Sequence, residues 1–171
     1  MTVAALIITS GTPGDDRPLA RLVDAAWSGG AHPILVSGLA AGTEPPTPAR
    51  RTTANDPAAA LADARGQVQG TSAIILLPYS HAGIDPESIT TLIAAHGRAP
   101  TALLTAAHEG QAGPVRLLPD AVAGDGVSHL VETGDEAAVT PSNGSARLNY
   151  DAPPSDSGAV DPWEQRGDQT R

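Results

Sequence analysis

Short, continuous apolar runs alternate along this chain with longer segments that are apolar on one side only. Each run is bounded by Gly, Ser or Pro, which is typical of strands buried on both faces of a parallel sheet. The longer segments repeat apolar residues at the spacing i, i+3, i+4 and i+7, which predicts amphipathic helices. The expected strands are 3–9, 32–38, 72–77, 100–105 and 113–119, and the expected helices are 18–28, 57–67 and 85–96.

Strands that alternate with helices predict a Rossmann-like, three-layer α/β domain with a mostly parallel sheet. In such a domain the ligand crevice is expected at the carboxyl ends of the strands. The rest of the pattern is weaker: a loop over 39–56, a short helix near 127–132, and strands near 137–140 and 145–150. We expect one domain over residues 1–151, followed by a disordered acidic tail over 152–171 that is rich in Pro, Gly and Asp.

Composition excludes several classes of function. The 171 residues include no Cys and no Lys, so all ten basic residues are Arg. Chemistry that needs a thiolate, a Schiff-base lysine or a P-loop lysine is therefore excluded. The formal net charge of −9 argues against nucleic acid and anionic membranes as partners. With no charged start before a long apolar run, we expect a cytoplasmic protein.

The stretch LIITSGTPGDDRP, residues 6–18, has the form of a buried strand, a glycine loop and a helix start. Backbone N–H groups at such a junction can hold a phosphate. Isolated glycines are weak evidence, and a plain strand-to-helix turn is the simpler explanation of them. Asp15 and Asp16 also repel a triphosphate unless a metal intervenes. As a phosphate loop, its nucleotide-binding residues are predicted to be Gly11, Thr12, Gly14 and Arg17.

Several segments resemble the MobA-like nucleotidyltransferase family in order and spacing. They include Ile8-Thr9-Ser10-Gly11 at the family's Leu-Ala-Ala-Gly signature, LLPYSHAGIDPESITTLIAAH over 76–96, and the closing LNYDAPPS over 148–155. The resemblance covers most of residues 3–153. It implies a nucleotide-diphospho-sugar transferase type of fold and, in an active member, transfer of a nucleotidyl group with Mg²⁺ as cofactor.

The departures from the family fall where the chemistry takes place. The loop arginine and lysine of the family are missing, and Ser80-His81-Ala82 stands at its Asp-x-Pro motif. Ser80 thus replaces a metal-binding carboxylate, although Mg²⁺ prefers carboxylate oxygen. Asn149 replaces the first aspartate of the closing motif, while Asp151 matches the second. The resemblance therefore gives Asp151, Ser80 and His81 as the candidate metal site.

Three hypotheses remain open. The first is a degenerate, non-catalytic nucleotidyltransferase homologue that binds a partner protein or a nucleotide. The second is an active NTP transferase in which Asp15 or Asp16, Asp125 and Asp151 surround Mg²⁺ and a small-molecule phosphate is the acceptor. The third is a structural dimerisation module. We name no catalytic residue, because neighbouring side chains such as Ser80 and His81 are expected to diverge.

Overall fold

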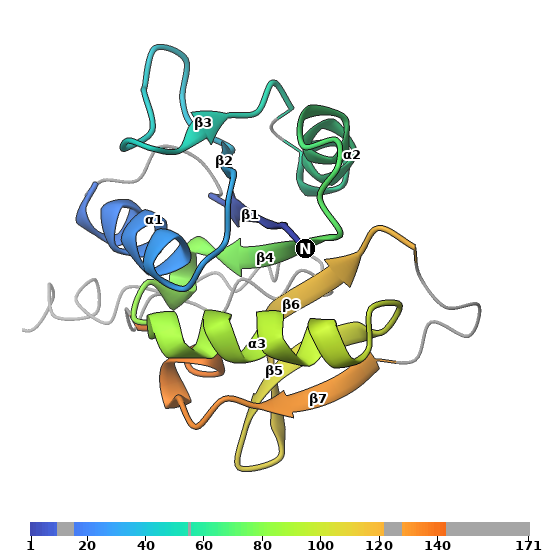
Figure 1. Cartoon of the computed structure of the whole chain (residues 1–171). Helices are drawn as coiled ribbons and strands as arrows, with labels where there is room; N and C mark the ends of the chain where they lie inside the picture. The colour runs from blue at the N-terminus through green and yellow to red at the C-terminus, as the bar shows by residue number, and fades with distance from the viewer. Residues whose placement is uncertain (10–15, 55, 122–127, 143–171) are drawn as a thin grey trace, which may run out of the picture.

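The computed structural model describes residues 1–9, 16–54, 56–121 and 128–142, which form a seven-stranded sheet with helices on both faces (Figure 1). The helices are α1 (Arg17–Ser28), α2 (Pro57–Gln67) and α3 (Pro86–Arg98), with 3-10 turns η1 (Tyr79–His81) and η2 (Glu136–Ala138). The strands are β1 (Val3–Ile8), β2 (Ile34–Ser37), β3 (Arg50–Arg51), β4 (Ala73–Pro78), β5 (Leu103–His108), β6 (Gln111–Pro119) and β7 (Ser128–Glu132).

The sheet is mostly parallel, as the sequence predicts. Its strand order is β3-β2-β1-β4-β6-β5-β7, and β6 is the strand that runs against both of its neighbours. β5 and β6 form a hairpin whose short connection needs no helix, whereas the parallel pairs β1–β2 and β1–β4 are joined through helices. The carboxyl ends of β1, β2, β3 and β4 consequently lie along one edge of the sheet.

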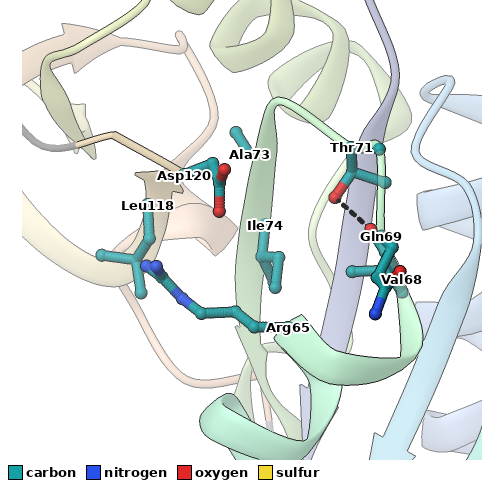
Figure 2. A pocket seen from close by; sticks show the side chains of 9 residues that line it. Arg65, Val68, Gln69, Thr71, Ala73, Ile74, Leu118 and Asp120 are labelled. Carbon is teal, nitrogen blue, oxygen red and sulfur yellow. Dashed lines mark hydrogen bonds between the residues drawn. The ribbon is translucent and has the colours of Figure 1, made fainter.

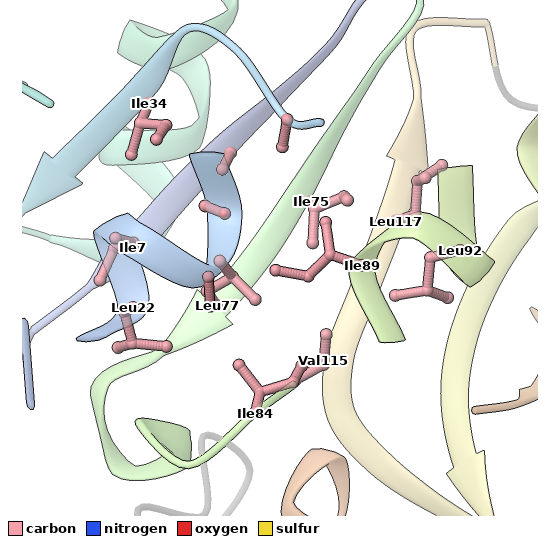
Figure 3. Close-up of a cluster of buried hydrophobic side chains, with 14 of the residues drawn as sticks. Ile7, Leu22, Ile34, Ile75, Leu77, Ile84, Ile89, Leu92, Val115 and Leu117 are labelled. Atoms are coloured by element: carbon pink, nitrogen blue, oxygen red, sulfur yellow. The ribbon is translucent and has the colours of Figure 1, made fainter. Parts of the chain in front are cut away.

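Alternate residues of β1 serve two cores on opposite faces of the sheet. Val3, Ala5 and Ile7 belong to the larger cluster, which packs under α1 and α3 (Figure 3). The intervening residues belong to a smaller cluster under α2. This arrangement explains why the strand is a continuous apolar run: both faces are removed from water.

The starts of α2 and α3 follow from local capping. Asp56 and Asp85 are the N-caps of α2 and α3, and their carboxylates accept hydrogen bonds from Ala59 N and Glu87 N, both at 2.9 Å. A proline follows each cap, where its missing N–H costs nothing. The predicted helix start at Asp85 is therefore confirmed.

Several predicted elements are wrong. Ser128–Glu132 is a strand, because it pairs in parallel with β5, and this tertiary pairing overrides the predicted helix over 127–132. The predicted strand near 137–140 is replaced by η2, which Asp135 caps by accepting from Ala137 N. Arg50–Arg51, predicted as loop, extends the sheet beside β2.

Other sequence predictions concern single residues or lie outside the described part. Trp27, near the end of α1, is 51% exposed and lies against the His32 ring with centroids 4.9 Å apart. The predicted strand at 145–150 and the tail over 152–171 lie outside the described residues. No helix among the described residues is long and apolar enough to cross a membrane.

Candidate functional site

The edge formed by the carboxyl ends of β1, β2 and β3 is lined by hydroxyl groups that bind backbone carbonyls. Thr9 Oγ1 donates to Ser37 O at 2.8 Å, and Ser37 Oγ donates in turn to Ala54 O at 2.9 Å. Thr52 Oγ1 lies 3.3 Å from Val36 O, to which it donates. All three side chains are buried. Each buried hydroxyl is thus satisfied by a hydrogen bond, and these bonds link the ends of the neighbouring strands.

Arg51 organises the loop that follows β2. Its guanidinium donates to Ala40 O at 2.8 Å, to Thr43 O at 3.2 Å and to Leu39 O. The planar fork of an arginine suits several carbonyls at once. Arg51 therefore holds the loop after β2 from the neighbouring strand β3.

Ser80 and His81 lie in the turn η1, directly after β4, and form a hydrogen-bonded pair. Ser80 Oγ is 2.9 Å from His81 Nδ1, so the expectation that these side chains diverge is wrong. The pair is almost removed from solvent, with exposed fractions of 9% for Ser80 and 4% for His81.

The other ring nitrogen of His81 fixes its tautomer. His81 Nε2 is 3.4 Å from Val139 O, a carbonyl that can only accept, so the proton resides on Nε2. Nδ1 is then free to accept the Ser80 hydroxyl proton. Desolvation by burial lowers the pKa of His81, and the bond to Val139 opposes this in part. The pair is consequently neutral at neutral pH.

The chain after η2 covers this pair. Ser142 donates to Ser80 O from its backbone N at 3.0 Å and from its hydroxyl at 3.2 Å. Together with Val139, this segment brings residues far along the chain to the carboxyl end of β4. No pattern in the sequence predicts these contacts, since Val139 and Ser142 bind through backbone groups and a common hydroxyl.

The structure brings together part of the predicted site. Ser80 and His81 meet, and Arg17 is an exposed residue that opens α1. The roles predicted for Gly11, Thr12, Gly14 and Asp151 concern positions outside the described residues. Within the described part, no group of three or more His, Cys, Asp or Glu side chains could hold a metal ion. The predicted metal role of Ser80 and His81 stays a prediction.

A second buried histidine lies on α3. His96 is fully buried, its Nε2 is 3.1 Å from Ser72 Oγ, and its Nδ1 has no hydrogen-bond partner among the described residues. Burial lowers the pKa of His96, as it does that of His81. Protonation of either ring would place a charge in a desolvated position.

We therefore expect the free energy of unfolding to fall as the pH drops below about 6.5, the pKa of an unfolded histidine. The unfolded chain binds more protons than the native one from there down to the lowered native pKa values, which favours unfolding. Each histidine contributes a slope of at most about 1.4 kcal/mol per pH unit. Urea unfolding at several pH values between about pH 8 and pH 5 measures how the free energy of unfolding changes with pH.

The double variant His81→Asn/His96→Gln separates the contribution of the two histidines to the pH dependence from that of the carboxylates, which also titrate in acid. It should show a shallower pH dependence than the wild type. The matched control is His129→Gln, since His129 is an exposed histidine on β7. Equal slopes in the wild type and the double variant would refute the assignment.

Comparisons with solved structures decide the type of fold. A structure of Rv0371c from Mycobacterium tuberculosis H37Rv in complex with manganese matches with a TM-score of 0.61 and 13% identity, over 77% of this chain and 88% of that one. The 2-C-methyl-D-erythritol 4-phosphate cytidylyltransferase of Thermus thermophilus matches with a TM-score of 0.56 and 16% identity, over 84% and 93%. The chain has a nucleotide-diphospho-sugar transferase type of fold.

The structural similarity is not accompanied by a detectable similarity in sequence. No protein-family model matches the chain. No curated protein sequence matches it either. The third comparison, with the Rv0371c homologue of Mycobacterium sp. strain JC1, has a TM-score of 0.53 at 13% identity, over 76% of this chain and 85% of that one. The predicted fold class is thus confirmed by structure.

Proposed function

We propose that this chain is a MobA-like nucleotidyltransferase-fold protein that does not catalyse nucleotidyl transfer, and that it binds a nucleotide at the carboxyl edge of the sheet without a divalent metal. The observation that carries the proposal is the Ser80–His81 pair. It is neutral, buried and bonded internally at the end of β4, where the family resemblance places a metal-binding carboxylate.

Nucleotidyl transfer depends on electrostatics at this edge. The triphosphate must be neutralised, and Mg²⁺ held by carboxylates aligns the attacking group with the phosphorus atom. A hydroxyl that donates to an imidazole, and an imidazole with both nitrogens engaged, offer Mg²⁺ no negative charge. Binding a metal here would also break two hydrogen bonds of the buried pair. The arrangement therefore suits a protein that retains the fold and lacks the metal-dependent step.

The nucleotide part of the proposal rests on the fold. The Thermus thermophilus neighbour is a cytidylyltransferase, and the M. tuberculosis neighbour was solved in complex with manganese. These two proteins make nucleotides and divalent metals the appropriate probes for this chain. Arg17, the basic residue that opens α1, is the cation that we propose to face the phosphates.

The test is thermal unfolding with ATP, GTP and CTP, each with Mg²⁺ and with EDTA. A ligand present at a hundred times its dissociation constant stabilises the native state by about 2.7 kcal/mol, a readily measured shift. We expect one nucleotide to raise the midpoint equally in both conditions. The shift should be reduced in Arg17→Gln and kept in Arg21→Gln, a matched exposed arginine four residues along α1.

The other possible results of the thermal unfolding test would each favour a different function. A shift that requires Mg²⁺ would contradict the non-catalytic proposal and favour an active, Mg²⁺-dependent NTP transferase with a rearranged site. No shift with any nucleotide would refute the nucleotide part and leave a partner protein or a dimerisation role. Mg²⁺ without nucleotide is the control, because the chain carries a net charge of −9 and binds cations diffusely.

A further inference from the structure

A small cavity lies at the opposite edge of the sheet from Ser80. Its volume is about 210 Å³, and it is formed where the last turn of α2 meets the start of β4 and the end of β6 (Figure 2). Drug-sized ligands occupy pockets of about 300 Å³ or more, so this cavity suits a much smaller molecule. A nucleotide does not fit it.

Two charges of opposite sign border the cavity without neutralising each other. Arg65 and Asp120 both line the cavity, with the Arg65 guanidinium beside Leu118 (Figure 2), and no ion pair joins the two side chains. The guanidinium of Arg65 makes one long hydrogen bond, 3.4 Å from Nη2 to Pro119 O. The carboxylate of Asp120 accepts no hydrogen bond from the described residues.

The backbone holds Asp120 in place. Its N–H donates to Ser72 O at 2.9 Å, which extends the antiparallel pairing of β4 and β6 by one step. Arg65 is equally fixed at its base, since it lies in α2. Arg65 and Asp120 are therefore anchored through their backbones, while the Asp120 side chain itself is exposed at the rim of the cavity.

Between the charges the cavity is apolar. Val68 and Ile74 are 5% and 3% exposed, and Leu118 beside them is half-buried. An apolar floor with a few converging polar groups is the usual composition of a small-molecule site. The ligand that fits must carry a negative group for Arg65, a positive group for Asp120 and a short hydrocarbon part for the floor.

We propose that this cavity binds the zwitterion of a small aliphatic α-amino acid. The carboxylate of the amino acid binds the guanidinium of Arg65, a geometry that an arginine fork accepts in bidentate fashion. The ammonium group donates to the carboxylate of Asp120, and the side chain packs on Val68, Ile74 and Leu118. The site is independent of the carboxyl edge and of the nucleotide proposed there.

The experiment is a two-dimensional ¹H–¹⁵N NMR titration of the full chain with L-leucine. We expect saturable shifts of the backbone amides of Gly70 and Thr71, which border the cavity. N-acetyl-L-leucine lacks the ammonium group, L-leucinamide lacks the carboxylate and glycine lacks the side chain. N-acetyl-L-leucine and L-leucinamide should each bind about tenfold more weakly or worse, because a hydrogen bond to a charged group is worth about 1.5–3 kcal/mol. Glycine should also bind about tenfold more weakly or worse, because burying an aliphatic side chain is worth about 1.5–3 kcal/mol.

Two variants test whether L-leucine binds in this cavity, and two matched variants test whether the loss of a charge elsewhere has the same effect. Arg65→Met and Asp120→Asn should each weaken L-leucine at least about tenfold. Arg116→Met, at an exposed arginine on β6 two residues from Leu118, and Asp24→Asn on α1 should leave the affinity unchanged. The proposal is overturned if L-leucine causes no saturable shift, if leucinamide or N-acetyl-leucine binds as well, or if Arg65→Met retains the affinity.

Discussion

Replacing Gly38 with alanine is expected to destabilise the protein by about 3–5 kcal/mol, a large part of the roughly 5–15 kcal/mol that holds a typical domain folded. Gly38 follows β2 with φ +84°, in the left-handed region that a side chain disfavours. A Cβ atom here would also collide with Thr9 O, which belongs to the backbone at the end of β1. Neither atom can move without separating β1 from β2.

Gly42→Ala is the matched control for this substitution. Gly42 also has a positive φ of +80°, but a Cβ atom there meets nothing within 4 Å. It should cost about 1 kcal/mol, the backbone penalty without the collision. Urea unfolding of both variants measures the two free energies. Equal costs for Gly38→Ala and Gly42→Ala would show that the close approach of the two strand ends is absent.

Ile75→Ala is expected to cost about 3–4 kcal/mol. Ile75 lies in the middle of β4, is fully buried and points into the larger cluster beneath α3 (Figure 3). Truncation removes most of the side chain from a position that β1 and β6 flank on both sides. Because backbone pairing prevents the strand from moving to fill the space, a cavity remains.

Two further substitutions, one smaller at the same position and one at an exposed position, test whether the loss of stability comes from a cavity in the core. Ile75→Val should cost about 0.5–1.5 kcal/mol. Leu130→Ala, at a side chain 53% exposed on β7, should change stability by less than about 0.5 kcal/mol. Chemical denaturation of the three variants ranks them directly. A cost for Leu130→Ala as large as that for Ile75→Ala would contradict the assignment of the core.

Local patterns in the sequence were sufficient for the buried strands and the capped helices. The run of aliphatic residues in β4 and the Asp-Pro start of α3 each carry their own signal. β7 carries none, because its residues become a strand only by pairing with β5, which is separated from it in the chain by the whole of β6. Pairing of this kind depends on tertiary contacts that periodicity does not report.

The candidate site was predicted less completely, for a related reason. Sequence reasoning placed Ser80 and His81 at the carboxyl end of β4, where the structure has them. Their mutual hydrogen bond and the Val139 carbonyl depend on the turn geometry and on a distant segment. The support that Arg51 gives to the loop after β2 was missed in the same way, since its partners are backbone carbonyls.

The cavity at the opposite edge shows the limit of motif reasoning. Arg65 and Asp120 are far apart in sequence, and neither belongs to a recognisable motif. They approach each other because β6 runs antiparallel to β4, which returns Pro119 to Ala73 and leaves Asp120 beside the end of α2. Only the sheet order makes this juxtaposition visible.

Binding of a nucleotide by this fold without the metal that catalysis requires can be measured in solution. Calorimetric titration of the nucleotide identified by thermal unfolding, first in EDTA and then in Mg²⁺, tests it most directly. We expect the dissociation constants in EDTA and in Mg²⁺ to agree within about twofold, a difference below about 0.4 kcal/mol. Affinity that rises about tenfold or more with Mg²⁺ would contradict it, because the Ser80–His81 edge would then belong to a working metal site.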